Sequence, residues 1–148
     1  CDLEDGLPFA KDKSFDVVCA LDVLEHLEHA HHTFLESLRV SRRALIVTLP
    51  NMYHWSYRLR YLVSGRISDK YDFPVHPVID RHRWLTSFEQ SLSFVLENTQ
   101  GYDVTVIALT PDRGRTSAIS TPIEKWLSSR WPNFFASRIL FHIRCPDC

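Results

Sequence analysis

The chain alternates short apolar runs with longer stretches in which apolar residues recur at helical spacing. Each apolar run is too short for an independent helix and predicts a β-strand. The four predicted strands are residues 15–21, 44–49, 102–109 and 138–144. The first of them, FDVVCAL, is continuous and rich in β-branched side chains. We therefore expect this strand to be buried on both faces.

Helical spacing of leucine and aromatic residues predicts helices between these runs. The predicted helices are residues 23–39 (preceded by a short turn), 51–65, 86–101 and a short one from 121. Asn51 is the expected N-cap of the second helix, and Thr86 to Glu89 has capping-box spacing for the third. Thr121 to Glu124 has the same spacing, and Gly65 and Gly101 are expected helix ends.

The order of these elements predicts an α/β fold with a mainly parallel sheet, because strands alternate with helices. The last two strands are expected to pair antiparallel around an insertion or cap at residues 111–137. Residues 67–80 predict a loop that is long enough to favour a functional role. At 148 residues, the chain fits one domain.

Composition excludes several classes of protein. The formal net charge of −1 argues against a nucleic-acid or anionic-membrane binder, which would carry a basic excess. The aromatic content of 12% argues against disorder, and no apolar run is long enough to span a membrane. Four scattered cysteines fit a reducing compartment, so we predict a cytoplasmic protein. The chain opens on Cys1 and its only methionine is Met52, so we expect processing or a fragment.

An ordered set of motifs near the start carries the most specific signal. Asp2 is followed by Leu7-Pro8-Phe9, by Phe15-Asp16-Val17-Val18 and by Leu24-Glu25-His26. This combination resembles the middle of a class I S-adenosylmethionine-dependent methyltransferase. Leu49-Pro50-Asn51 and the run from His82 to Thr86 are similar to type-11-like members. The tract from His54 to Arg66 is similar to MetW-like members.

The resemblance implies S-adenosylmethionine as the cofactor and a Rossmann-like methyltransferase sheet. It implies that Asp2 accepts a hydrogen bond from the adenine amine, while the backbone N–H of Leu3 reaches a ring nitrogen. It also implies that Ala20 and Leu21 line the methionine end and that His26 faces the cofactor pocket. From the residues alone, Asp2 is equally a frayed terminal residue, Ala20 and Leu21 are core, and His26 is a hydrogen-bonded, partly buried histidine.

The glycines depart from the family pattern. The chain has four, at positions 6, 65, 101 and 114, and no pair is spaced for the glycine-rich turn that approaches the cofactor. We therefore expect residues 1–148 to be the C-terminal part of a single methyltransferase domain. Its sheet would be incomplete by two or three strands, and the isolated chain would bind the cofactor poorly.

Histidines beyond the second predicted strand are the candidate bases for methyl transfer to a hydroxyl or amine. Of His54, His76 and His82, we select His82 and His54, although a solvated loop histidine explains each as well. The acceptor is expected to be a small molecule or lipid. The alternative is a non-catalytic module acting through protein contacts, which the aromatic residues Trp126, Trp131, Phe134 and Phe135 motivate.

We expect no metal site and no disulfide framework. The residues that suggest a metal cluster are Glu25, His26, Glu28, His29, His31 and His32. Only pairs three or four positions apart share a helix face, and no further ligand follows at zinc-site spacing. Cys145 and Cys148 form a lone CxxC, which is weak evidence for a metal or redox site. Asp16 is expected to cap or pair at the start of its strand.

Overall fold

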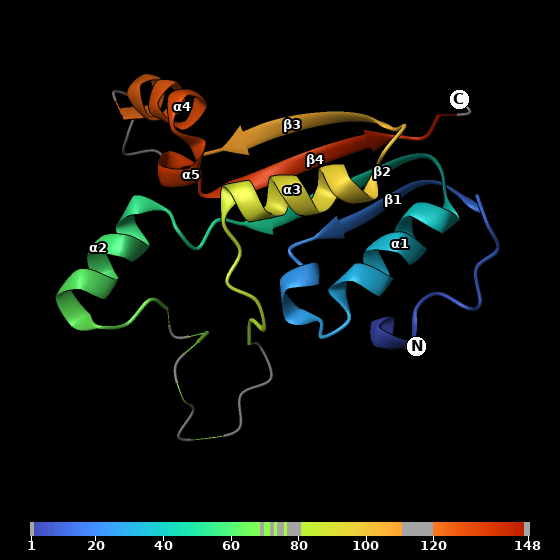
Figure 1. Ribbon diagram of the computed structural model, residues 1–148, viewed down its shortest axis with the longest axis horizontal. Coiled ribbons are helices and arrows are strands. Elements are labelled where there is room, and N and C mark those ends of the chain that lie inside the picture. The colour runs from blue at the N-terminus through green and yellow to red at the C-terminus, as the bar shows by residue number, and fades with distance from the viewer. Residues whose placement is uncertain are drawn as a thin grey trace.

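A computed structural model describes residues 2–68, 70, 71, 73, 76, 81–110 and 120–146 (Figure 1). Among these residues, four strands form one sheet in the order β1-β2-β4-β3. The strands are β1 (Phe15–Leu21), β2 (Ser41–Pro50), β3 (Asp103–Leu109) and β4 (Arg138–Arg144). β1 and β2 pair in parallel, and β4 runs antiparallel to both of its neighbours. The predicted α/β sheet with one final antiparallel strand is confirmed.

The hydrophobic core lies between one face of this sheet and two helices, α1 (Ala30–Val40) and α3 (Phe88–Asn98), as Figure 1 shows. The strands place alternate residues on that face, and the register aligns them in rows such as Ala20, Val47 and Phe141. The fully buried side chains of this layer include Phe34, Leu45, Val47, Val95, Ile139, Phe141 and Ile143.

The opposite face of β1 is exposed, which corrects the expectation that this strand is buried on both sides. Val17 is 49% exposed and Leu21 is 53% exposed, whereas Ala20 between them is buried. In the described sheet β1 is an edge strand that pairs with β2. Its odd-numbered residues point away from α1 and α3. The apolar run of β1 is therefore covered on one face only.

The observed helices begin at other residues than the predicted ones. The segment predicted as one helix at 23–39 splits into a 3₁₀ turn, η2 (Leu24–His26), and α1. α2 (Trp55–Ser64) is capped by His54, because the buried Asn51 side chain instead donates to the carbonyl of Ala136 at 2.7 Å. The last two described helices are α4 (Ser120–Arg130) and α5 (Pro132–Phe135). Thr121 therefore lies inside α4 and is not its cap.

The capping box of α3 lies one position later than predicted. Ser87 and Gln90 form it, since Thr86 donates its hydroxyl to the carbonyl of Pro50 at 2.6 Å. α3 ends at Asn98, and Gly101 has φ +87° in the turn that leads to β3. A left-handed backbone of this kind is one that glycine adopts readily.

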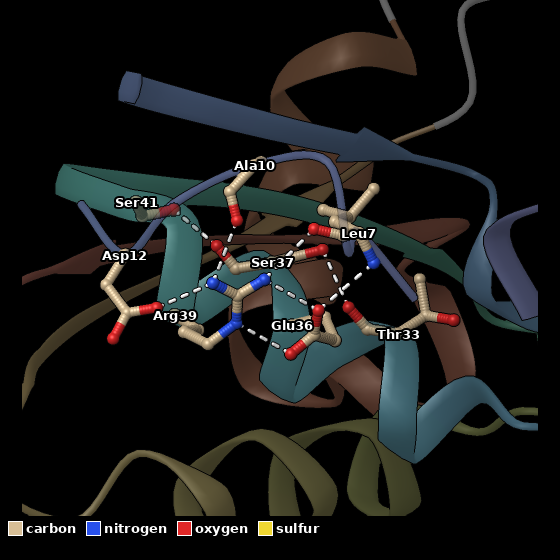
Figure 2. Close-up of polar contacts among 8 residues, drawn as sticks. All are labelled: Leu7, Ala10, Asp12, Thr33, Glu36, Ser37, Arg39 and Ser41. Atoms are coloured by element: carbon tan, nitrogen blue, oxygen red, sulfur yellow. Dashed lines mark hydrogen bonds and ion pairs between the residues drawn. The ribbon is translucent and has the colours of Figure 1, made fainter. Parts of the chain in front are cut away.

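A charged network fixes the N-terminal segment to α1 (Figure 2). The Arg39 guanidinium donates to both carboxylate oxygens of Glu36, at 2.7 and 2.8 Å, and to the carbonyls of Ala10 and Leu7, at 3.0 and 3.1 Å. It also donates to Asp12 at 2.6 Å. Elsewhere Asp16 pairs with Arg42 across β1 and β2, as expected for the start of this strand.

The described helices are all too short or too polar to cross a membrane. Predicted loop residues 67–80 are described only in part, and residues 111–119 lie outside the described residues. The second half of the predicted insertion at 111–137 contains α4 and α5. Cys148 of the predicted CxxC lies outside the described residues. Cys145 is buried, and its Sγ donates a hydrogen bond to the Ser41 carbonyl at 3.7 Å.

Candidate functional site

A pocket of about 810 Å³ opens at the carboxyl ends of the three parallel strands. In Figure 1 the arrowheads of β1, β2 and β3 point to this side, and β4 enters the sheet there. Residues at the strand ends and in the segments that follow them line it, among them Asp22, Glu25, His26, Pro50, Tyr57, Lys70, His82, Leu109 and Arg138. Ligands of open α/β sheets bind at this edge, so this pocket is the candidate site.

Asp22 follows β1 directly and has a left-handed backbone, with φ +52°. Asp tolerates this conformation better than most residues. Its carboxylate accepts a hydrogen bond from the Thr48 hydroxyl at 3.0 Å and lies 3.1 Å from the Arg138 guanidinium. The strained turn thus fixes a charged group at the mouth of the pocket, where three strands meet.

Glu25 is the most unusual group in the site. It is only 2% exposed, and its Oε2 has no hydrogen-bond partner among the described residues. Burial raises the pKa of this carboxyl, and the nearby charge of Asp22 adds to the effect. The Glu25 backbone carbonyl accepts hydrogen bonds from the N–H groups of Arg83 and Trp84, at 2.8 and 3.3 Å. These contacts dock residues 81–86 onto η2.

Two imidazoles lie beside this carboxylate. The rings of His26 and His82 meet edge to face, with centroids 4.6 Å apart. His26 Nδ1 lies 2.9 Å from the Arg81 carbonyl, which can only accept, so Nδ1 carries the proton. The Tyr71 hydroxyl donates to the Trp84 carbonyl at 2.6 Å and lies 3.1 Å from His82 Nδ1, which therefore donates to it. With Nδ1 as the donor, the neutral form of each ring has its lone pair on Nε2.

One potential ligand atom from each of Glu25, His26 and His82 lies within 4.8 Å of the other two. We call these residues the Glu25–His26–His82 cluster. Both histidines were predicted from the sequence as site residues, His26 for the cofactor and His82 as a base. The only sequence signal for the cluster was that Leu24-Glu25-His26 and His82 both belong to the family motifs.

Comparison with models of known protein families assigns the chain to one of them. The sequence model of the family described as "Methionine biosynthesis protein MetW" matches residues 1–143. The chain belongs to the MetW family. This confirms the resemblance drawn from the residues 2–27 and 54–66. A comparison with curated proteins gives no match.

Solved structures confirm the fold of this MetW-family chain. A SAM-dependent methyltransferase from Archaeoglobus fulgidus superposes with a TM-score of 0.52 at 15% identity, covering 98% of this chain and 66% of that one. A SAM-dependent methyltransferase from Thermotoga maritima gives 0.54 at 13% identity, covering 95% and 60%. One from Mesorhizobium loti gives 0.52 at 14%, covering 98% and 67%. The MetW-family chain thus has the class I methyltransferase fold and spans about two thirds or less of these neighbours.

The residues expected to bind a cofactor in this MetW-family chain are divided between three places. Asp2 and Leu3 belong to the turn η1 (Leu3–Asp5), where Asp2 accepts a hydrogen bond from the N–H of Glu4 at 3.0 Å. Glu4 in turn accepts from the N–H groups of Glu28 and His29, at 2.6 and 2.8 Å. These hydrogen bonds lower the pKa of Glu4 and hold η1 against the start of α1.

The other predicted cofactor residues lie at or beyond the end of β1. The Ala20 side chain is part of the core, so only its backbone is available to a ligand. Leu21 is half-exposed on the face away from α1 and α3. His26 lines the carboxyl-edge pocket. The roles of these residues toward the cofactor stay predictions.

The two predicted catalytic histidines of the MetW-family chain have different surroundings. His82 lines the pocket within the cluster. His54 is buried, and its Nδ1 accepts a hydrogen bond from the N–H of Ser56 as the N-cap of α2. Two histidines at the start of α1 have separate partners: the N-cap residue His29 lies 3.1 Å from Glu4, and His31 lies 2.8 Å from Asn98.

Proposed function

We propose that this chain forms the acceptor-facing part of an S-adenosylmethionine-dependent methyltransferase. The observation that carries the proposal is the pocket at the carboxyl edge, with the Glu25–His26–His82 cluster in its wall. Its volume of about 810 Å³ is on the scale of small-molecule sites. Charged lining residues such as Lys70 and Arg138 favour a polar acceptor. We expect a cytoplasmic protein without a nucleic-acid partner.

The residues near η1 fit the adenine end of the cofactor in chemical type. Asp2 is an exposed carboxylate, which suits the exocyclic amine, and the exposed Leu3 side chain offers an apolar surface to the ring. The described glycines have other uses, since Gly6 follows η1 and Gly65 caps α2. A glycine-rich cofactor turn is therefore not among the described residues.

The cofactor supplies an electrophilic methyl group on a sulfonium sulfur. The pocket residues would orient the acceptor for in-line attack, and positioning of this kind provides most of the rate. For a hydroxyl or amine acceptor, His82 would take the proton at Nε2, because its Nδ1 proton is held by Tyr71. The acceptor heteroatom would thereby gain the methyl group as the carbon–sulfur bond of the cofactor breaks, leaving S-adenosylhomocysteine.

Calorimetry with S-adenosylhomocysteine tests the cofactor part of this proposal. We expect Asp2→Asn to weaken binding about tenfold, since Asn preserves the cap of η1 but loses the charge. Asp5→Asn, in the same exposed turn, is the matched control and should leave the affinity unchanged. Equal effects of the two variants, or no binding by the wild type, would overturn the assignment.

Exposed apolar surface supports a second candidate, a non-catalytic module that acts through protein contacts. Val17 and Leu21 are half-exposed on β1, and Trp126 and Trp131 are 60% and 50% exposed. Surfaces of this kind mark interaction sites. Light scattering together with cofactor titration discriminates the two candidates. A monodisperse monomer that ignores the cofactor favours the module, whereas saturable cofactor binding favours the enzyme.

A further inference from the structure

We propose that Glu25, His26 and His82 bind a divalent transition-metal ion in the wall of the carboxyl-edge pocket. The proposal rests on the arrangement of these three side chains and does not depend on methyl transfer. The sequence alone predicted no metal site, because the third ligand lies far along the chain from the first two. Residues 81–86 bring it there by docking on the backbone of Glu25.

The distances suit a common ion. The three potential ligand atoms lie within 4.8 Å of one another, and His26 Nε2 is 3.9 Å from Glu25 Oε1. Ligand atoms at 2.0–2.2 Å from one ion lie about 3.4 Å apart at tetrahedral angles. Loading would therefore draw the side chains together by about an ångström, which rotation of the two half-buried rings allows.

The two imidazoles are already oriented as metal ligands are. A ligating histidine usually donates its second ring N–H to a carbonyl or other acceptor, which fixes the tautomer and the ring plane. Here the Arg81 carbonyl holds Nδ1 of His26, and the Tyr71 hydroxyl holds Nδ1 of His82. Both rings thus have their lone pair on Nε2, the form that coordinates a metal.

The Glu25 carboxylate supplies the second, independent observation. Its side chain is 1% exposed and its Oε2 has no hydrogen-bond partner among the described residues. An unsatisfied oxygen of this kind is costly, and a cation at the cluster would satisfy it. The charges that face the cluster are mixed, since Asp22 attracts a cation while Lys70 opposes it.

The donor set selects the class of ion. Two imidazole nitrogens and one carboxylate oxygen suit zinc, manganese, iron or cobalt, whereas magnesium and calcium prefer oxygen ligands alone. Three protein ligands leave further positions open toward the pocket. If the proposed function holds, an acceptor hydroxyl or carboxylate would occupy one of them, and His82 would then act as a ligand in place of a base.

Titration of the chelator-treated chain with Co²⁺ and with Zn²⁺ tests the proposal, with neither cofactor nor acceptor present. We expect one equivalent of Co²⁺ to bind with visible absorption bands, and Zn²⁺ to displace it. His26→Ala and His82→Ala should each weaken Zn²⁺ binding at least tenfold. His31→Ala, on the exposed face of α1, is the control and should leave the affinity unchanged.

Two further variants distinguish the loss of a metal ligand from the loss of the folded structure. Tyr71→Phe keeps the ligands but removes the hydrogen bond to His82, and should weaken Zn²⁺ binding about tenfold. Glu25→Gln preserves side-chain shape and should abolish the rise in melting temperature that Zn²⁺ gives to the wild type. Binding by the histidine variants at wild-type affinity, or saturation by Mg²⁺ alone, would overturn the proposal. Neither result bears on cofactor binding, which calorimetry measures separately.

Discussion

Two glutamates on the connection between β1 and β2 have opposite surroundings. Both carboxylate oxygens of Glu36 accept hydrogen bonds, from Arg39 and from the N–H of Leu7 at 3.0 Å. These contacts lower the pKa of Glu36 to about 2. Glu25, eleven positions earlier in the printed sequence, is more deeply buried, has one unpartnered oxygen within the described residues, and has a raised pKa.

The comparison distinguishes a carboxylate that stabilises the fold, Glu36, from one that belongs to the candidate site, Glu25. At Glu36 the charge, its partners and the backbone of residues 7–12 form a closed network, so the group has no remaining capacity for a ligand. At Glu25 the fold buries a carboxylate without completing its hydrogen bonds. A buried charge of this kind reduces stability unless something else binds it, which makes it a mark of function.

Removal of the closed network should have the largest effect. Glu36→Ala leaves Arg39 and the N–H of Leu7 without their acceptor, so we expect the free energy of unfolding to fall by about 2 kcal/mol. Urea denaturation measures it. Glu97→Ala, at an exposed position of α3, is the control and should change stability by less than about 0.5 kcal/mol.

The same carboxylate predicts a pH dependence. Because its pKa is lowered from 4.5 to about 2 on folding, its contribution is fully present above about pH 4.5. The contribution is lost as the pH falls from there toward 2. The stability difference between wild type and Glu36→Gln should shrink over this window. A difference that stays constant with pH would show that the carboxylate charge is irrelevant.

A methyl group at Gly6 should collide with residues of the Glu36–Arg39 network. Gly6 has φ +78°, and a Cβ there would lie 2.7 Å from His32 Nε2 and 3.1 Å from Glu36 Cγ. We expect Gly6→Ala to cost about 2 kcal/mol in thermal or urea unfolding. Gly65→Ala has a similar φ of +68° with no atom within 4 Å, so it reports backbone strain alone. Equal costs would exclude the steric effect.

A substitution at Glu25 should change the free energy of unfolding in the opposite direction. In the metal-free chain, Glu25→Gln removes a buried charge and should raise the free energy of unfolding at pH 7 by about 1 kcal/mol. Because the folded pKa of Glu25 is raised, the gain should vanish as the pH falls below the ordinary carboxyl pKa, where both states are protonated. Destabilisation at pH 7 would mean that the carboxylate has a partner in solution.

An exposed pair should matter least. Asp16 and Arg42 interact across β1 and β2, but both side chains are more than half exposed. We expect Asp16→Asn to change the unfolding free energy by no more than about 0.5 kcal/mol. A larger loss in urea denaturation would mean that pairing alone, without burial, is sufficient for the stability assigned to Glu36.

The sheet was predictable because its apolar runs are continuous. The bounds of β1 and β4 match the predicted ones, whereas β2 begins three residues early, at Ser41. Ser41, Arg42 and Arg43 carry no apolar signal. They join the strand because Ser41 pairs with Phe15 of β1 and the Arg43 carbonyl accepts a hydrogen bond from the N–H of Cys145. Exposure of β1 was missed for a related reason: apolar composition does not report how many faces are covered.

The site was predictable only in pieces. His26 and His82 were chosen from family motifs, but their meeting depends on backbone hydrogen bonds from Arg83 and Trp84 to Glu25, which leave no sequence pattern. His54 was chosen as a base, and its role as the N-cap of α2 was not foreseen, because an imidazole nitrogen can accept a proton or a hydrogen bond. The sequence does not indicate that one carboxylate oxygen of Glu25 has no hydrogen-bond partner among the described residues.

The position of β4 has a consequence for how the chain folds. β4 follows the other three strands in the sequence, yet it lies between β2 and β3. Until it arrives, β3 has no strand to pair with in the described sheet, and the side of the core formed by Ile139, Phe141 and Ile143 is missing. Sheet completion therefore waits for pairings of long sequence separation, which are slow to form. A ribosome-bound chain that has not yet exposed β4 should remain a loose, protease-sensitive intermediate.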